Sequence, residues 1–182
     1  MKSLTPYWLI LASVALGALL GCSSTSTKSA EVSDSIQSSL RQAGLNDVSV
    51  SQDREKGVVT LGGRVASEDQ KLQAASIAMS LAGQQVVANS IAVVPPGAEK
   101  DARQVNSDLD KGIDNNLHAA LVVDKLDHQV KYTIKNHVVT LTGDVDSQEK
   151  RTRAGDIAST VPNVHQVVNE LQVKKQKATS SN

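Results

Sequence analysis

The chain has very few cysteine and aromatic residues. Its 182 residues include one cysteine, one tryptophan, two tyrosines and no phenylalanine. A single cysteine excludes a disulfide within the chain. Tyr7 and Trp8 lie near the N-terminus, so Tyr132 is the only aromatic residue in the remainder. Proteins that bind single-stranded nucleic acid stack its bases on aromatic side chains, and this chain offers almost none.

An excess of positive charge is also missing. Nineteen Lys and Arg residues are balanced by nineteen Asp and Glu residues. Residues 31–94 contain five basic against seven acidic residues, and residues 105–174 contain eight against ten. Proteins that bind nucleic acid neutralise its phosphates with a basic surface. We therefore expect no nucleic-acid partner.

Motifs of catalysis and metal binding are absent too. The sequence contains no nucleophile elbow, phosphate-binding loop or metal-binding helix motif. We therefore expect no enzyme activity, no cofactor and no small-molecule substrate. The histidines lack the close spacing of zinc ligands, so we expect them to be exposed to solvent and to form no metal site. They are His118, His128, His137 and His165, of which His128 and His137 flank one predicted hairpin and are the pair that could meet.

The N-terminus has the pattern of a secreted bacterial lipoprotein. Residues 1–21 predict a signal peptide, because a positive start is followed by an apolar run too short for a comfortable membrane span. The segment Leu19-Leu20-Gly21-Cys22 resembles a lipobox, in which the cysteine is acylated and becomes the mature N-terminus. A free thiol at Cys22 is the alternative, but the position directly after the apolar run favours acylation. Such an anchor would hold the protein on a membrane surface.

Two polar segments flank the predicted domains. Residues 22–30 are rich in Ser and Thr and predict a flexible tether. The eight residues after Cys22 reach at most about 27 Å, so the first domain would stay near the membrane. Residues 175–182 predict a disordered tail.

One strand pattern occurs twice. Val58-Val59-Thr60-Leu61-Gly62-Gly63-Arg64-Val65 returns as Val138-Val139-Thr140-Leu141-Thr142-Gly143-Asp144-Val145. Alternating β-branched residues predict a strand, and Gly63 and Gly143 predict a bulge or a close backbone approach. From Val58 to Val94 the alignment with residues 138–174 is free of gaps at an offset of 80. A repeat of this length indicates a duplicated supersecondary unit.

Each copy predicts the order helix–strand–strand–helix–strand. Helical spacing places Val32, Ile36, Leu40 and Ala43 on one face, and Val87, Asn89, Ile91 and Val93 alternate as a single last strand. The first helix matches Ile113, Leu117 and Ala120 at an offset of 77, which predicts a three-residue insertion within residues 121–128. The domains are therefore 31–94 and 105–174. The linker 95–104 is partly helical, because helical spacing resumes near Glu99.

The two copies resemble BON domains. The resemblance rests on the Val-Val-Thr-Leu-x-Gly-x-Val segments, the amphipathic helix after each, and the closing segments with Asn89 and Asn169. It covers nearly all of the chain after the tether, and the whole plan is similar to dual-BON outer-membrane lipoproteins. The resemblance implies two tandem α/β domains of the α+β type. Each has a three-stranded mixed sheet packed on two helices, and the family has no known catalytic residues.

The second copy departs from the family at one turn. The family's glycine before the motif strand is Gly57 in the first copy, but His137 stands there in the second. Asn136 is beside it and tolerates positive φ, so we expect Asn136 to take over the turn. We interpret Gly63 and Gly143 as residues of the strand motif with a structural role.

The second copy also contains the candidate lipid-binding residues. They form an apolar run beside a cation, which suits shallow insertion among anionic headgroups: Leu121, Val122, Val123, Lys125 and Leu126. In the alternative reading, Leu121 caps the core and the valines fold under the loop. A basic cluster, Lys150, Arg151 and Arg153, opens the later helix, with Asp144, Asp146 and Glu149 near enough to neutralise it.

These patterns predict a lipid-anchored binding module that contributes to cell-envelope integrity or stress response. The resemblance implies binding of phospholipid or other envelope components, and Ser23 in place of aspartate implies sorting to the outer membrane, on its periplasmic face. The expected partners are the membrane, through the Cys22 anchor and anionic phospholipid, and envelope proteins. The alternative is an adaptor that recruits envelope proteins through a sheet edge.

Overall fold

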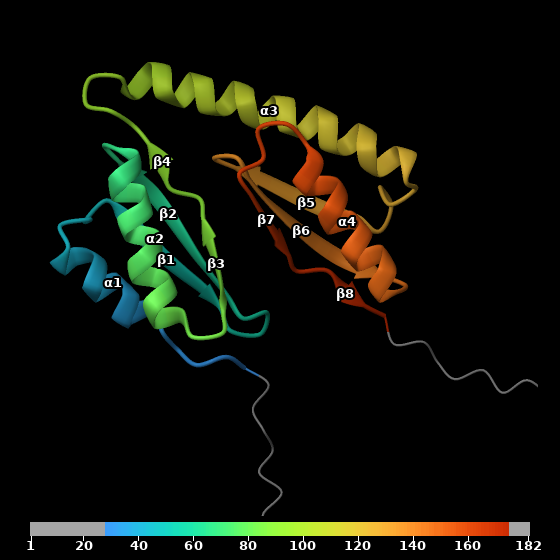
Figure 1. The fold of residues 1–182 in the computed structure, drawn as a ribbon, viewed down its shortest axis with the longest axis horizontal. Coiled ribbons are helices and arrows are strands. Elements are labelled where there is room, and N and C mark those ends of the chain that lie inside the picture. The colour runs from blue at the N-terminus through green and yellow to red at the C-terminus, as the bar shows by residue number, and fades with distance from the viewer. Residues whose placement is uncertain (1–27, 175–182) are drawn as a thin grey trace, which may run out of the picture.

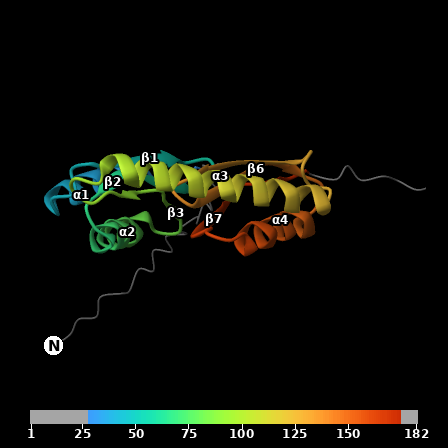
Figure 2. The ribbon, with the colours of Figure 1, turned by 90° about the horizontal axis from the view of Figure 1, so that it is seen from above.

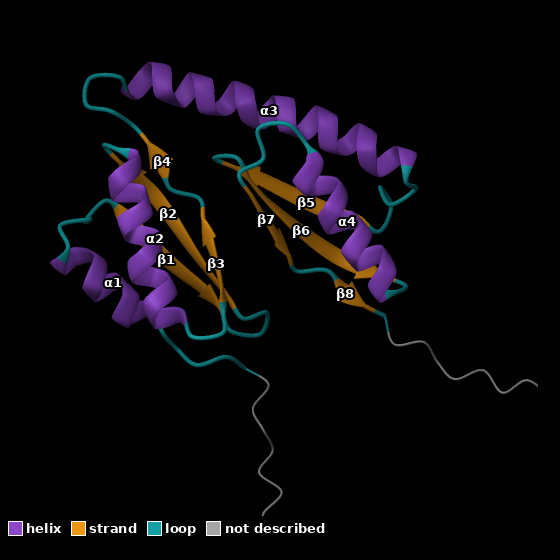
Figure 3. Ribbon diagram, in the orientation of Figure 1, coloured by secondary structure: helices purple, strands orange, loops and turns teal. Residues whose placement is uncertain are grey.

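The computed structural model describes residues 28–174, which form two units with the same order of elements (Figures 1 and 3). The first unit contains α1 (Ser33–Gln42), β1 (Val48–Asp53), β2 (Val58–Val65), α2 (Glu68–Ala82), β3 (Val86–Asn89) and β4 (Ala92–Val93). The second contains α3 (Glu99–Val123), β5 (Val130–Lys135), β6 (Val138–Val145), α4 (Gln148–Thr160), β7 (Gln166–Asn169) and β8 (Gln172–Val173). The predicted leader, Cys22 and the C-terminal tail lie outside the described residues.

Each unit forms one mixed sheet around its long strand. In the first unit β1 runs antiparallel to β2, and β3 and β4 both run parallel to β2. The second unit repeats the arrangement with β5, β6, β7 and β8. This confirms the predicted fold class of two tandem α/β units with mixed sheets. The third strand of each predicted sheet is divided into two short strands, β3 and β4 or β7 and β8.

The last strand of each unit is broken, whereas the alternation of apolar residues predicts a continuous one. The Asn89 side chain causes the break: its Oδ1 accepts the Ile91 N–H at 3.4 Å and its Nδ2 donates to the Lys71 carbonyl at 3.4 Å. Asn169 makes the equivalent bonds to Leu171 and Arg151. The apolar pattern continues through the break because β4 and β8 still pair with the same central strands.

Each sheet buries one face against its own helices. Figure 1 shows α2 and α4 on the same side of their sheets, and Figure 2 shows them as a layer apart from the strands. The first core combines Ile36 and Leu40 of α1, Ala74 and Ala78 of α2, and Val59 and Leu61 of β2. The second combines Ile113 and Leu117 of α3, Ala154 and Ala158 of α4, and Val139 and Leu141 of β6. The two cores are separate, as duplication of a compact unit requires.

One long helix joins the units. α3 begins at Glu99, where helical spacing resumes in the sequence, and continues for 25 residues without interruption at Gly112. Only its second half, from Ile113, contributes to the core of the second unit. The connection between the units is therefore the short segment 94–98 followed by a rigid helix.

The ends of α1 and α3 match at an offset of 81, so the offset of 77 taken from the sequence is one helical turn out of register. The Leu45 N–H bonds to the Leu40 carbonyl, and the Leu126 N–H bonds to the Leu121 carbonyl, each at 2.9 Å. These are Schellman caps, in which the residue after the cap packs against the last turn. A shift of four residues keeps the same face of a helix toward the core, so apolar spacing alone does not fix the register.

The segment 28–30 belongs to the first unit, although the sequence predicts that it is part of the flexible tether. The Ser29 N–H donates to the Arg54 carbonyl at 2.8 Å, and Arg54 Nε donates to the Ser29 carbonyl at 2.8 Å. The Ala30 carbonyl accepts from the side-chain amides of Gln52 and Gln85. Backbone and side-chain bonds thus fix the chain at the β1–β2 turn before α1 begins.

The two units also pack against each other, which the sequence does not predict. β3 and β7 lie side by side, and Gln166 donates to the Val87 carbonyl at 2.7 Å and accepts the Asn89 N–H at 2.9 Å. Lys56 Nζ lies 2.7 Å from Glu170 Oε2, and Asn136 donates to the Ser90 carbonyl at 2.7 Å. A small apolar cluster is buried between the units: Val58, Ala88, Val138 and Val168.

Candidate functional site

The end of α3 carries the most exposed apolar side chains of the predicted lipid site. Val123 is 80% exposed and Val122 is 46% exposed, and Lys125 follows them on the surface. We call Val122, Val123 and Lys125 the α3 knob. The valines do not fold under the loop, so this surface is open to solvent.

Leu121 and Leu126 are not part of this surface: the alternative reading placed Leu121 in the core, whereas the burial of Leu126 was not predicted. Their exposed fractions are 1% and 3%, and both belong to the core of the second unit. The reason is the Schellman cap, whose hydrophobic contact joins these two leucines. Lys125 occupies the cap position with φ 58°, where the first unit has Gly44 with φ 78°. This backbone geometry directs Leu126 inward and leaves the Lys125 side chain outside.

The basic cluster at the start of α4 is occupied by bonds within the protein. Lys150 lies 2.7 Å from Asp146, and Arg153 lies 2.8 Å from Asp124. Arg151 donates to the carbonyls of Leu171 and Asn169. Lys150 also holds the pKa of Asp146 below its ordinary value, chiefly through their hydrogen bond. The cluster is thus matched by internal acceptors, of which only Asp146 is among the acidic residues that the sequence indicated.

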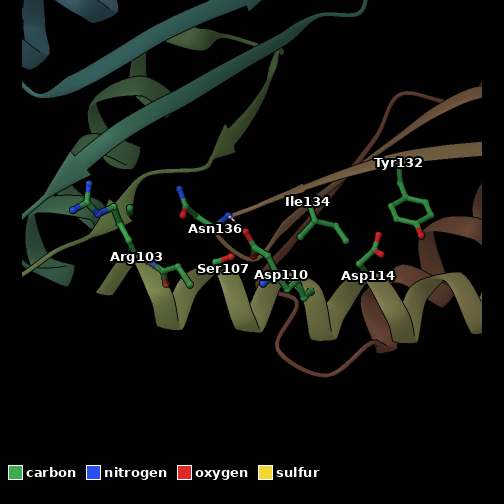
Figure 4. A pocket seen from close by; sticks show the side chains of 10 residues that line it. Arg103, Ser107, Asp110, Asp114, Tyr132, Ile134 and Asn136 are labelled. Carbon is green, nitrogen blue, oxygen red and sulfur yellow. Dashed lines mark hydrogen bonds between the residues drawn. The ribbon is translucent and has the colours of Figure 1, made fainter. Parts of the chain in front are cut away.

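A polar groove of about 470 Å³ lies between α3 and the β5 side of the second sheet (Figure 4). Asp110 on α3 accepts the backbone N–H groups of Asn136 and His137, each at 2.9 Å. Figure 4 shows Asp114 and Tyr132 facing each other across the groove. Burial, followed by Asp114, raises the pKa of Tyr132. Through Asp110, this groove fastens α3 to the β5–β6 turn.

The β5–β6 turn uses two residues with positive φ. Asn136 has φ 48° and His137 has φ 66°, the same value as Gly57 in the first unit. Asn136 therefore adopts the left-handed conformation as expected, but His137 adopts it as well. Two consecutive left-handed residues form the tight turn that favours hairpins, and Asp110 binds its N–H groups.

The expected exposure of the histidines holds for His118, His128 and His165 but not for His137, whose Nε2 is buried, and the pair that meets is not His128 and His137. His128 is exposed and lies 3.5 Å from Asp127, whereas His137 packs edge-on against His165 with ring centroids 4.7 Å apart. His128 precedes β5 and His137 follows it, so the length of the strand separates them. Within residues 28–174, no cluster of three or more potential metal-ligating side chains occurs. In the same range, no helix has the length and apolar character needed to cross a membrane.

The BON domain model matches residues 28–95 and 109–175, which together span most of the chain. The chain belongs to the BON domain family. Both matched ranges contain the complete set of strands and the second helix of a unit. The first ten residues of α3 lie between the ranges and form the bridge that joins the two BON domains.

One curated relative and two solved structures define the comparison further. The osmotically-inducible protein Y of Escherichia coli (strain K12) is 32% identical over 133 residues, which cover 70% of this chain and 62% of that protein. The C-terminal domain of CdsD, a structural protein of the type III secretion system of Chlamydia trachomatis, matches with 13% identity and a TM-score of 0.33 over 78% of this chain and 66% of its own. A second CdsD structure gives 15% identity and a TM-score of 0.31 over 79% and 62%. Because their TM-scores are this low, the two CdsD structures support no conclusion about this chain.

Gly63 and Gly143 are structural residues at equivalent positions of the two BON domains. Gly63 has φ 92°, and a Cβ there would overlap the Asp47 carbonyl oxygen. Gly143 has φ 119°, and a Cβ there would overlap the Gln129 carbonyl oxygen. Both glycines let the start of the antiparallel strand approach β2 or β6 closely.

Sequence reasoning missed the polar residues that fasten α3 to its own sheet and the residues that join the two BON domains. Asp110 binds a turn 26 residues away, and Lys56 pairs with Glu170 across 114 residues. No local pattern marks such contacts, because each partner reads as an ordinary surface polar residue.

Sequence reasoning also missed one local signal, an uncharged stretch in α2: residues 72–84 contain no charged side chain.

Proposed function

We propose that this protein is a lipid-anchored binding module in the bacterial periplasm, on the periplasmic face of the outer membrane, where it contributes to envelope integrity or stress response. Membership of the BON family supports this role, as does likeness to a protein whose name describes osmotic induction. The predicted signal peptide and lipobox supply the anchor on Cys22. The binding step is contact between the α3 knob and anionic phospholipid.

The exposure of Val123 is the observation that carries this proposal. Val123 is 80% exposed beside a half-exposed valine, so its apolar surface is in contact with water. Moving this surface into a lipid interface lowers the free energy of the system. Lys125 adds attraction to anionic headgroups of about 1 kcal/mol. Because Leu121 and Leu126 pack in the core below, the knob is held on a rigid base.

The adaptor alternative has less support, because the edges at β1, β3, β5 and β7 are at least partly occupied. The Gln37 side chain of α1 donates to the Val48 carbonyl and accepts the Val50 N–H, which occupies part of the free edge of β1. β3 lies against β7, and α3 flanks β5. A partner strand would have to displace these elements before it could pair.

Co-sedimentation with vesicles tests the proposed lipid contact. We expect the chain from Cys22 onward, without acylation, to pellet with vesicles that contain phosphatidylglycerol, and increasing salt to release it. Replacing both knob valines by threonine (V122T/V123T) should weaken binding about tenfold, because each lost methyl group is worth about 0.8 kcal/mol in an apolar environment. Lys125→Gly should remove most of the salt dependence.

Val105→Thr is the matched control, because Val105 is 56% exposed on α3 but lies far from the knob. Equal pelleting of this control and of V122T/V123T would contradict the lipid contact. Mass measurement of the protein from cell envelopes tests the anchor separately. A free Cys22 thiol, or an uncut leader, would refute it.

A further inference from the structure

Beyond its acidic first turn, the outward side of α2 carries two exposed large apolar side chains. Leu72 and Met79 are each 60% exposed and lie seven residues apart, which places them on the same face about 10 Å apart along the helix. Leu81 and Val86 are exposed as well, with fractions of 38% and 48%, but they lie on another side of the domain, beside residues 29–32. From Leu72 to Gln84 the chain has no Lys, Arg, Asp or Glu. We call Leu72 and Met79 the α2 face.

The second BON domain shows that the fold does not require this face to be apolar. At an offset of 80, Leu72 corresponds to Thr152 and Met79 to Ser159 on α4. Arg153 and Asp156 stand on the outside of α4, where α2 has Gln73 and Ser76. Two helices with the same place in the same fold thus differ on their solvent sides. Exposed Leu and Met on α2 therefore mark an interaction surface.

The position of the N-terminal segment indicates what covers this surface. Lys28 pairs with Glu55 at 3.2 Å, and the Ala30 carbonyl accepts from Gln85 at 3.1 Å, three residues beyond the end of α2. The chain therefore leaves the first BON domain beside the C-terminal end of α2. Five residues lie between Lys28 and Cys22, so the anchored cysteine is within about 20 Å of this end.

We propose that the α2 face is a second membrane contact, which lies on the bilayer that holds the acylated Cys22. This inference rests on the lipid anchor of the proposed function, but it uses a different surface and different chemistry from the α3 knob. Because the α2 face has no cation, it contacts zwitterionic lipid as well as anionic lipid, and salt does not release it. The contact orients the tethered protein, and the absence of charge spares it the cost of desolvating an ion.

A pair of single-tryptophan variants tests this contact. Cys22 is the only cysteine, and the sole tryptophan, Trp8, precedes it, so the chain from Cys22 onward can be coupled to a maleimide lipid and labelled cleanly. Met79→Trp places the reporter on the α2 face, and Ser159→Trp places it at the equivalent position on α4. In phosphatidylcholine vesicles at high salt, we expect Trp at 79 to shift its emission to the blue and to be quenched by brominated lipid. Trp at 159 should show neither effect.

Leu72→Thr in the Met79→Trp chain should reduce the quenching, because it removes the second apolar anchor of the face. Equal quenching at positions 79 and 159, or none at 79, would overturn the proposal. A blue shift at 79 that needs no lipid and grows with protein concentration would also overturn it, in favour of a second copy of the chain. Since the coupling replaces natural acylation, a bare Cys22 in cells would refute the anchor without changing this measurement.

Discussion

At the scale of single residues, two neighbouring glycines of the long strand differ sharply in what they tolerate. Gly63 has φ 92°, and a side chain would collide with the Asp47 backbone. At Gly62 a Cβ would meet the flexible ends of Ser49 and Lys135, at 3.1 and 3.9 Å. The second BON domain has Thr142 at the position of Gly62 but keeps glycine at 143. Glycine is thus kept in both domains only at the position where the backbone geometry requires it.

Gly63→Ala should therefore lower the free energy of unfolding by at least about 2 kcal/mol, because a left-handed conformation and a backbone collision act together. Gly62→Ala should change it by less than about 1 kcal/mol, because only flexible side-chain ends must move. Urea unfolding of both variants measures the difference. Similar losses in the two variants would show that the collision at Gly63 is relieved elsewhere.

At the scale of elements, α3 and the β5–β6 turn are held together by a few polar contacts. Asp110 fixes the turn backbone, and the ring of the turn residue His137 packs against His165. His137 Nε2 is buried and has no hydrogen-bond partner in residues 28–174. Burial lowers the pKa of His137, the charges of His165 and Lys71 lower it further, and Asp110 acts in the opposite direction. The neutral imidazole is therefore the form that this packing accommodates.

The lowered pKa of His137 predicts a loss of stability in mild acid. The unfolded chain binds the proton near pH 6.5, but the folded protein binds it only at lower pH. The unfolded state then holds more protons, so stability is complete above about pH 6.5 and falls as the pH decreases toward the folded pKa. His137→Asn keeps a residue that tolerates positive φ and should flatten this dependence.

Urea unfolding between pH 7.5 and pH 5 measures this effect. His128→Gln is the control, because the His128 side chain is 93% exposed and its replacement should leave the pH dependence as in the parent protein. The same slope in the parent and in the His137→Asn variant would exclude His137 as its source.

At the scale of the whole molecule, the two BON domains meet through equivalent positions. Lys56 of the first contacts Glu170 of the second, and Asn136, the counterpart of Lys56, contacts Ser90, the counterpart of Glu170. The buried cluster follows the same rule, since Val58 pairs with Val138 and Ala88 with Val168 as counterparts. Such reciprocity is the mark of a two-fold relation, here within one chain.

Lys56→Glu should loosen this junction, because it places a carboxylate against Glu170, whose side chain is only 10% exposed. The pairing also raises the pKa of Lys56, chiefly through the hydrogen bond to Glu170. We expect faster amide hydrogen exchange in β3 and β7 and a loss of about 1 kcal/mol of stability, a modest value because Lys56 is partly exposed.

Lys100→Glu on the first turn of α3 makes the same charge change at an exposed site away from the junction. It should leave exchange in β3 and β7 unaltered. Unchanged exchange in the Lys56→Glu variant would mean that the apolar cluster and Gln166 hold the domains together without the ion pair.

The mixed sheet was implied by the resemblance to BON domains. The sequence by itself determined the duplication, the order of helices and strands and the glycines of the long strands. These features follow from local periodicity and from backbone geometry, which a repeated pattern displays twice. The lipid-binding residues were only partly predictable. An apolar run beside Lys125 marked the end of α3, but it did not separate buried Leu121 and Leu126 from exposed Val122 and Val123.

Tertiary structure alone decided the register of α3, the break at Asn89 and the junction between the domains. A four-residue shift preserves the apolar face of a helix, so the cap at Lys125 was needed to place its end. An asparagine in an alternating pattern does not reveal that its side chain replaces a strand bond. Contacts between residues as far apart as Lys56 and Glu170 depend on how two finished sheets meet, which no local pattern records.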